Sequence, residues 1–211
     1  REGDAYELLG SLVELEHRFV IRLEYDRRTD DGKGGSRPLS DAIAEASFRS
    51  GLKRELVLQP RYGAPKAGSK DVSYKHKRRK ADVRFRSATV HILRPEQRND
   101  LDYLPEKVPL NIVEVIETDP PKGAQPVRWR LATTEPVDTD EDLLRVVDIY
   151  RTRWVVEEFF KAIKTGCAYE KRQVESARAL LNVLAVTLPI AVHMLMLRDL
   201  AHAETSVAAD H

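Results

Sequence analysis

The hydrophobic pattern of this 211-residue chain changes its period once, at EPVDTDED (residues 135–142). Before this segment apolar residues mostly alternate with polar ones, as in strands with one buried face, and after it they recur at helical spacing. Strands are predicted at 18–27, 55–60, 81–95, 109–118 and 127–134, and helices at 4–17, 140–166 and 176–202. The sequence therefore predicts an α/β fold with a β-rich middle and long C-terminal helices.

Two segments of the first half are rich in polar and charged residues. Residues 28–52 include DDGKGGSRP, which is typical of a loop, and a short helix is expected near 41–48. Residues 66–86 hold nine Lys or Arg against two Asp. Such a run is either the solvated tip of a hairpin or a surface that contacts phosphates, and the sequence leaves both interpretations open.

Composition excludes several classes of protein. The chain is 42% hydrophobic, enough for a sizeable core, and its net charge of +1 does not by itself indicate a nucleic-acid partner. A single cysteine, Cys167, excludes an internal disulfide framework, and no Cys/His cluster has zinc-ligand spacing. The apolar stretch 179–197 is interrupted by polar residues and by Pro189, so we expect a buried, kinked helix and no membrane span. No secretory signal is visible, and a cytoplasmic location is expected.

The helix predicted at 140–166 has two different faces. On a wheel of about 100° per residue, one narrow stripe holds Tyr150, Arg153, Glu157, Lys161 and Lys164. The opposite side, expected to face a core, holds Val155, Val156, Phe159, Ala162 and Ile163. The stripe is either a solvated face with a surface ion pair between Glu157 and Lys161, or a metal-binding carboxylate among groups that hold phosphates. Periodicity alone favours the surface pair, and Trp154 beside the stripe is interpreted as a packing residue.

The stripe also carries a fixed spacing: Tyr, two residues, Arg, three residues, Glu, six residues, Lys. With this spacing and the flanking segments PPKGAQPVRW, TTEPV, LRVVDIY and RWVVEEFFKAIKTG, the chain resembles the bacterial cut-and-paste DDE transposases of the insertion-sequence-four family, in particular its Tn-five-like members. The close similarity covers residues 116–170. The remainder matches more loosely.

The resemblance implies a partial ribonuclease-H-like core interrupted by a β-rich insertion and followed by C-terminal helices. Residues 1–27 would belong to the core, 28–136 to the insertion, and 137–211 to the core helices that bear the signature. The resemblance also implies an Asp, Asp, Glu triad that binds two Mg²⁺ or Mn²⁺ ions, with Glu157 as its catalytic third carboxylate and metal ligand. Two such ions can activate an attacking oxygen and stabilise a leaving one at phosphorus.

DNA at transposon ends is the partner that the resemblance implies. Tyr150, Arg153, Lys161 and Lys164 match positions that contact the DNA backbone near the cleavage site. Trp129 matches a tryptophan on which a flipped base stacks, whereas without the family it would be interpreted as a core residue of a strand. The family works as a homodimer in a synaptic complex, and it cuts the ends, forms and reopens a hairpin, and joins the ends to target DNA.

The first residues depart from the family pattern. In the family the second catalytic Asp directly precedes an Arg-Glu dipeptide, and this chain begins Arg1-Glu2. The two aspartates are therefore expected upstream of position 1, and the 211 residues alone are expected not to cleave DNA. The alternative is a non-catalytic DNA-binding remnant that inhibits an intact transposase by occupying its ends.

Overall fold

The computed structural model describes residues 5–58, 61–62, 74–76, 79–168, 173–174 and 176–208. The chain divides into two compact units, Arg1–Tyr150 (the N-terminal unit) and Arg151–His211 (the C-terminal unit). The division falls inside helix α3, so the boundaries expected after residues 27 and 136 stay predictions.

The N-terminal unit is built on a seven-stranded sheet of order β1-β9-β8-β7-β2-β3, with β4 also paired to β7. Every pairing between its described strands is antiparallel. Its strands are β1 (Val20–Arg22), β2 (Arg28–Asp30), β3 (Ser36–Pro38), β4 (Lys53–Leu58), β7 (Arg79–Leu93), β8 (Lys107–Glu117) and β9 (Arg128–Thr133). A separate pair consists of β5 (Arg61–Tyr62) and β6 (Tyr74–His76). The helical elements are α1 (Tyr6–Glu14), α2 (Leu39–Ala44), a 3-10 turn at Asn99–Leu101 and the start of α3 (Asp140–Lys161). The predicted α/β class is confirmed.

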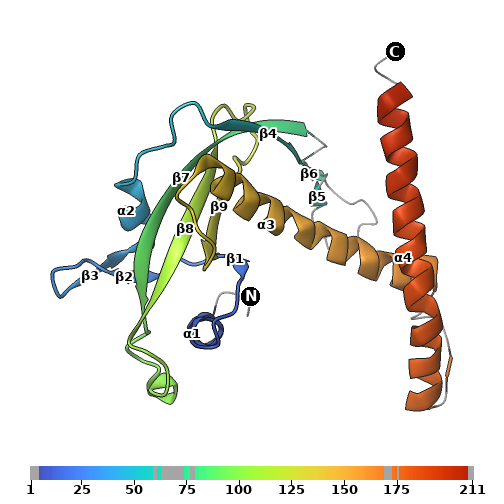
Figure 1. The fold of residues 1–211 in the computed structure, drawn as a ribbon, viewed down its shortest axis with the longest axis horizontal. Coiled ribbons are helices and arrows are strands. Elements are labelled where there is room, and N and C mark those ends of the chain that lie inside the picture. The colour runs from blue at the N-terminus through green and yellow to red at the C-terminus, as the bar shows by residue number, and fades with distance from the viewer. Residues whose placement is uncertain are drawn as a thin grey trace. The chain divides into compact units, whose positions relative to one another are not determined.

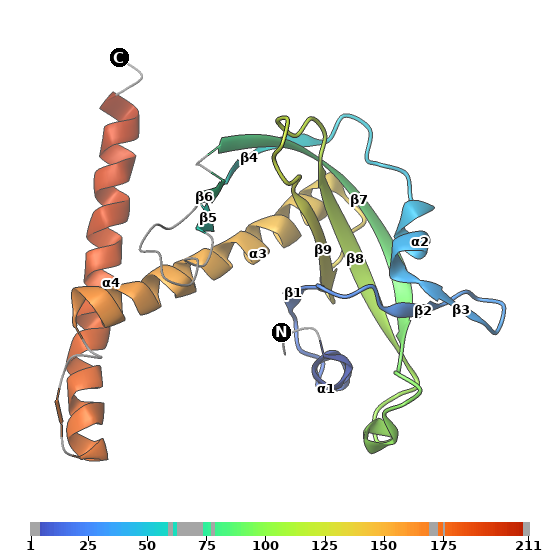
Figure 2. The same cartoon turned by 180° about the vertical axis from the view of Figure 1, so that it is seen from behind.

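β7 is long enough to join two parts of the sheet. It pairs with β8 through Val83–Leu93, while β4 pairs with Arg79–Arg84 and β2 with Ile92 near its other end (Figures 1 and 2). β1 lies in the segment predicted as core and β9 in the segment predicted as insertion, so both segments contribute to one sheet.

The strand predicted at 18–27 is mostly wrong, since β1 covers only Val20–Arg22. The chain leaves the sheet after Leu23 because Asp26 is used to hold α2. Its carboxylate accepts hydrogen bonds from the Ser40 backbone N–H (2.8 Å) and hydroxyl (2.6 Å). Asp26 therefore bonds to the first turn of α2 and lies outside the sheet.

Each face of the sheet carries an apolar cluster. On the face that we call the α1–α2 face, Leu9 of α1 and Ile43 of α2 pack with Val108, Leu110 and Ile112 of β8. On the opposite face, which we call the α3 face, the first turns of α3 pack on β7, β8 and β9 through Leu143, Val146, Val147, Phe85, Val113, Val115 and Leu131. Because side chains alternate along a strand, β8 serves both clusters.

The C-terminal unit consists of the rest of α3, a π-helical turn at Ala162–Gly166, and α4 (Ala177–Ala208). Its buried cluster is Ile163, Cys167 and Ala191, with Phe159, Ala162 and Leu188 against it. The helix predicted to continue as an α-helix to Gly166 thus changes to π geometry for its last five residues. An added Cβ at Gly166 would meet the terminal methyl of Met194 at 3.0 Å, so the π turn lies close to the Met194 side chain of α4.

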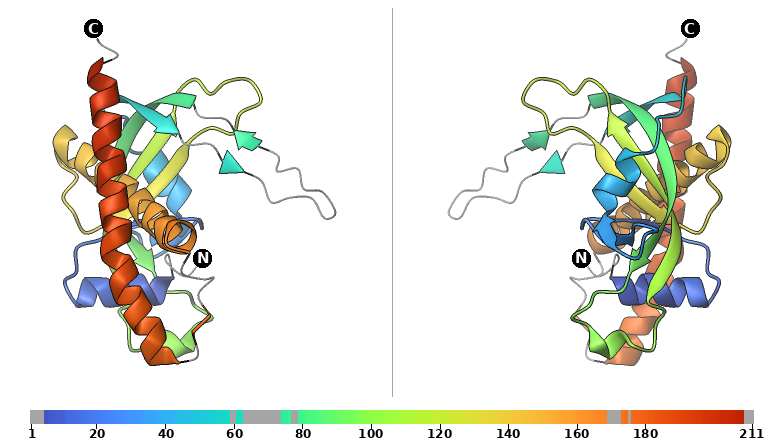
Figure 3. Two further views of the ribbon diagram at one scale, coloured as in Figure 1. Left: turned by 90° about the vertical axis from the view of Figure 1, so that its right-hand side faces the viewer. Right: turned by 90° about the vertical axis from the view of Figure 1, so that its left-hand side faces the viewer.

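α4 is a single long helix with Pro189 inside it (Figure 3). Its segment Ala177–Arg198 is long and apolar enough to cross a membrane, and only 11% of its most apolar window is buried within the described residues. The expectation of a helix buried in a globular core is therefore not met by the described part of this chain. Length and composition alone are weak indications of a membrane helix, because core helices of soluble proteins pass the same test.

Candidate nucleic-acid interface

The structure brings together two of the predicted site residues, Trp129 and Tyr150. Their ring centroids lie 5.1 Å apart at an interplanar angle of 63°, an edge-to-face arrangement. Trp129 stands on β9 opposite Val115, and Tyr150 lies on α3, so both rings border the cluster of the α3 face. Such an aromatic pair contributes about 0.5–1.5 kcal/mol beyond the area that it buries. Trp129 is only partly buried.

The start of α3 is fixed by a reciprocal cap. The Asp142 backbone N–H donates to Thr139 Oγ1 (3.1 Å), and the Thr139 backbone N–H donates to Asp142 Oδ2 (3.0 Å). Hydrogen bonding of the Asp142 carboxylate to the Thr139 backbone N–H, and then to the Thr139 side chain, lowers the pKa of Asp142. Asp140 and Glu141 add negative charge to the first turn, where the helix dipole favours it. The cap sets where α3 begins on the sheet and hence where Tyr150 falls.

Glu157, the predicted metal ligand, forms an ion pair with Arg153 one turn earlier on α3. Both side chains are about half exposed, at 47% and 50%. The cation is therefore not Lys161, which the surface-pair interpretation had expected. The Arg153 guanidinium also lies 5.5 Å from the ring centroid of Trp154, whose exposure of 48% contradicts its interpretation as a packing residue.

Lys161 is the last residue of α3, and Lys164 lies in the π turn that follows, both with exposed side chains. The wider winding of a π turn changes the angle per residue from the value used to place Lys164 on the wheel. The predicted core side of this helix is wrong in its middle, where Val155 and Val156 are 57% and 52% exposed. Packing in the C-terminal unit instead begins at Phe159 and centres on Ile163 and Cys167.

The described residues do not fit a two-metal site on their own. They include no group of three or more His, Cys, Asp or Glu side chains placed to hold a metal ion. Glu157 offers one carboxylate, and its charge is already met by Arg153. Two divalent ions held by carboxylates need more oxygen ligands than this.

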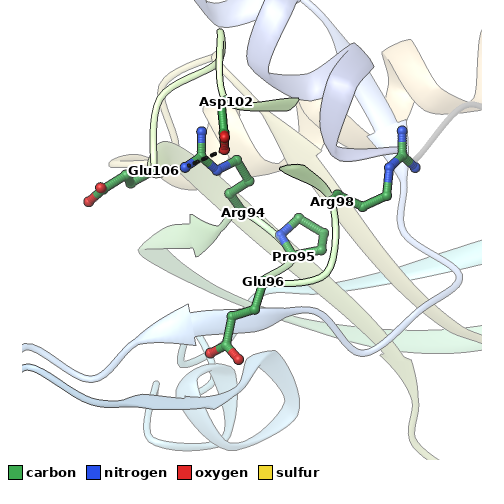
Figure 4. Close-up of a pocket in the computed structure, with 6 residues that line it drawn as sticks. All are labelled: Arg94, Pro95, Glu96, Arg98, Asp102 and Glu106. Atoms are coloured by element: carbon green, nitrogen blue, oxygen red, sulfur yellow. Dashed lines mark ion pairs between the residues drawn. The ribbon is translucent and has the colours of Figure 1, made fainter. Parts of the chain in front are cut away.

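The N-terminal unit contains a hollow of about 210 Å³ (Figure 4). It is lined by Arg94, Pro95, Glu96, Arg98, Asp102 and Glu106, at the connection between β7 and β8. Arg94 is held by Asp102 at 3.2 Å and by the Leu101 and Leu104 carbonyls at 3.1 and 3.0 Å. Its three carboxylates outnumber its two guanidinium groups, so it suits the folding of this connection better than the binding of an anion.

Sequence reasoning missed a group of arginines on the α1–α2 face. Glu114 is fully buried on β8, and it is paired with Arg86 on β7 and with Arg128 and Arg130 on β9. Burial opposes ionisation of Glu114, but hydrogen bonds from Arg86 and Arg128 outweigh it, and the pKa of Glu114 is lowered. The signal in the sequence was the alternation RFR at 84–86 and RWR at 128–130.

The basic segment 66–86 falls largely outside the described residues. Of this segment the structure describes β6 and the part that belongs to β7 from Arg79 onward. Within that part, Arg79 pairs with the buried Glu117, and Lys80 pairs with Glu55 at 2.8 Å. Both interpretations of residues 66–86, the solvated tip of a hairpin and a surface that contacts phosphates, therefore stay predictions.

Comparison with protein families assigns most of the chain to one domain type. Residues 5–188 match the family model described as Transposase DDE domain. The match includes the whole sheet, β9 with Trp129, all of α3 and the first turns of α4. All of the predicted site residues lie inside it. On this match, which spans well over half of its length, the chain belongs to the transposase DDE domain family.

Proposed function

We propose that this chain is the C-terminal part of the catalytic domain of a cut-and-paste DNA transposase, of the insertion-sequence-four, Tn-five-like kind. The observation that carries the proposal is the family match, which contains the Tyr-Arg-Glu-Lys spacing, with Tyr150, Arg153 and Glu157 on α3 and Lys164 in the π turn that follows it. The parent protein would have a ribonuclease-H-like core and would cleave, hairpin and transfer DNA strands at transposon ends.

Glu157 is proposed as the third carboxylate of the triad and Arg153 as a phosphate contact. Their ion pair supports this assignment, because it keeps an acid and a guanidinium side by side on an exposed helix face. When DNA and metal bind, the guanidinium would donate two hydrogen bonds to a phosphate, and the carboxylate would coordinate a Mg²⁺ or Mn²⁺ ion. When bound, the metal pair would supply activation of the attacking oxygen and stabilisation of the leaving one.

Lys161 and Lys164 are proposed as further phosphate contacts, since both are exposed near the end of the same helix. Trp129 and Tyr150 are proposed to work together in the N-terminal unit. The edge-to-face contact holds the indole ring in place, so that its exposed part offers a flipped base a surface worth about 1–3 kcal/mol of stacking. The Tyr150 hydroxyl would add a hydrogen bond to the DNA backbone.

The two aspartates of the triad are proposed to lie outside residues 1–211. We therefore expect the isolated chain to bind DNA and not to cleave it. We further propose a cytoplasmic reaction on DNA, homodimerisation of the parent in a synaptic complex, and no membrane partner. Because no membrane partner is proposed, we expect the purified chain to be soluble without detergent.

Binding by the α3 stripe is tested with the purified chain and a short fluorescent DNA duplex, in a series of salt concentrations. Lys161→Ala with Lys164→Ala is expected to weaken binding and to reduce the slope of log K against log salt by about 2, because each phosphate contact contributes about 0.9. Lys33→Ala with Lys122→Ala is the matched control, since both of these lysines are exposed residues of the N-terminal unit. Equal slopes for the two double variants would remove the stripe from the interface.

The role of Glu157 is tested by cleavage. Supercoiled plasmid incubated with the isolated chain and Mg²⁺ is expected to stay intact. The protein translated from the whole open reading frame is expected to nick it, and Glu157→Gln is expected to abolish nicking while leaving DNA binding unchanged. Mg²⁺-dependent nicking by the isolated chain, lost in Glu157→Gln, would overturn the placement of the aspartates.

A further inference from the structure

Four arginines of β7 and β9 share the α1–α2 face of the sheet, at the end that the apolar cluster does not reach. The strand register places Arg86 and Arg130 on either side of Glu114, and Arg84 and Arg128 on either side of Ile116. Neighbouring strands lie about 4.8 Å apart, so the arginines of β7 and β9 stand about 10 Å apart across β8. We call Arg84, Arg86, Arg128 and Arg130 the arginine patch.

Glu114 explains only part of this patch. Arg86 makes the closest contacts with it, at 2.7 Å from Nε and 2.5 Å from Nη2. Arg128 and Arg130 add longer bonds from their Nε atoms, at 3.0 and 3.3 Å. A buried carboxylate needs one well-placed cation to offset its charge. Three guanidinium groups on one carboxylate leave the site with net positive charge.

The outer members of the patch present their guanidinium groups to solvent. The Arg128 side chain is 52% exposed, and its bond to Glu114 uses Nε, which leaves the two terminal nitrogens for another acceptor. Arg84 is exposed, and its guanidinium carbon lies 4.5 Å from the ring centroid of Phe48. Arg86 lies over the same ring at 4.8 Å. The aromatic ring orients these two groups without neutralising them.

Other charges on this face do not cancel the patch. Asp26 takes one bond from Arg130 at 3.1 Å. Farther along β7 and β4 are Asp82 and Glu55, and Glu55 is paired with Lys80 at 2.8 Å. Lys53, opposite Arg84 on β4, adds a further exposed cation beside the patch. Among the described residues the balance around Ile116 and Glu114 is therefore positive.

We propose that the arginine patch binds phosphates of the DNA backbone, as a contact site additional to the α3 stripe. The proposal rests on the proposed function, which supplies DNA as the partner. Planar guanidinium forks match phosphate oxygens in a bidentate manner, and exposed guanidinium groups on two strands about 10 Å apart suit a chain of phosphates better than a single small anion. Contacts of this kind position the duplex without reading its sequence.

The experiment uses the purified chain and the same fluorescent duplex. Arg84→Gln with Arg128→Gln is expected to fold normally, because both side chains are exposed and Arg86 still pairs with Glu114. It should reduce the salt slope by about 2 and weaken binding at physiological salt. The control is Arg28→Gln with Arg98→Gln, whose guanidinium groups are exposed and bonded locally to Ser36 and Asp100. Thermal melting by circular dichroism checks that all variants are folded.

The outcomes separate this inference from the proposed function. If the patch variant behaves like its control while Lys161→Ala with Lys164→Ala weakens binding, the patch is not a DNA contact and the proposed function stands. If none of the variants changes the affinity or salt slope, neither the α3 stripe nor the arginine patch contacts DNA, and both of these assignments are overturned. Patch-dependent binding of polyglutamate or single-stranded RNA in preference to the duplex would show another class of partner and overturn the inference.

Discussion

The two units of this chain bury their apolar residues to very different extents. The N-terminal unit has a cluster on each face of its sheet, with Phe85, Ile112 and Leu131 fully buried. In the described part of the C-terminal unit only Ile163, Cys167 and Ala191 are buried apolar residues. Many of its large apolar side chains are exposed, among them Trp154, Val155, Val156, Phe160, Leu181, Val186, Met196 and Leu197. The sheet therefore has a core of its own. The long helices of the C-terminal unit bury little apolar surface against each other, so their stability depends on further packing partners.

The glutamate side chains of the two units also differ in how deeply they are buried. Glu114 is fully buried among three arginines, and Glu135 is 5% exposed and paired with Arg18. Glu157 is about half exposed and has Arg153 beside it on the same helix. A buried carboxylate with several partners is part of the fold, while an exposed one with one partner can exchange that partner for a ligand.

Truncation of a phenylalanine in each unit gives the largest expected difference. Phe85→Ala should lower the free energy of unfolding by about 3–5 kcal/mol, because the side chain is fully buried. Phe160→Ala is the matched change in the C-terminal unit, and with 53% of that residue exposed it should cost well under about 1 kcal/mol. Urea unfolding followed by circular dichroism measures both. Equal costs would contradict the difference in burial.

Neutralising the buried carboxylate of Glu114 gives the second largest expected difference between the units. Glu114→Gln should destabilise the protein at neutral pH by about 2 kcal/mol, since it leaves three guanidinium groups around a neutral amide. Glu157→Gln is the exposed counterpart and should change stability by a few tenths of a kcal/mol, as expected for a surface pair one helical turn apart. The same urea titrations measure this difference, and a large loss in Glu157→Gln would argue that Glu157 has a structural role.

A smaller effect is expected in the pH dependence of stability. The pKa of Glu114 is lowered from 4.5 in the folded protein, so its contribution is fully present above about pH 4.5 and is lost as the pH falls through the folded value. The melting temperature should therefore fall less steeply between pH 6 and pH 3 for Glu114→Gln than for the unmodified chain. Hydrogen bonding from Arg79 lowers the pKa of Glu117 in the same direction, so the acid dependence should be reduced and not abolished. An unchanged profile would show that Glu114 does not titrate with unfolding.

Most elements could be predicted because hydrophobic period is a local property. The runs around Val83, Val113 and Leu131 predicted β7, β8 and β9, and the helical period after residue 139 predicted α3. The strand at 18–27 could not be predicted correctly, because Asp26 is used by Ser40, fourteen residues later in the chain. Exposure of Val155 and Val156 was also missed, since periodicity gives a helix an apolar side without supplying anything to cover it.

The candidate site was predicted in part for a related reason. The stripe of Tyr150, Arg153, Glu157, Lys161 and Lys164 comes from one helix, so spacing along the sequence was enough to group it. The arginine patch needs strands that meet only in the sheet. Nothing in RFR or RWR alone indicates that both would lie on either side of a buried glutamate.

The sequence by itself determined the order of strands and helices along the chain, the spacing of the Tyr-Arg-Glu-Lys signature and the family to which the chain belongs, because all of these can be read from patterns along the chain. The tertiary structure decided that the Trp129 ring meets Tyr150, that three arginines surround Glu114, and that the apolar residues of the C-terminal unit are largely exposed. These depend on strand register and on what packs against each face. Register and packing are set by contacts between segments far apart in sequence, which no local pattern contains.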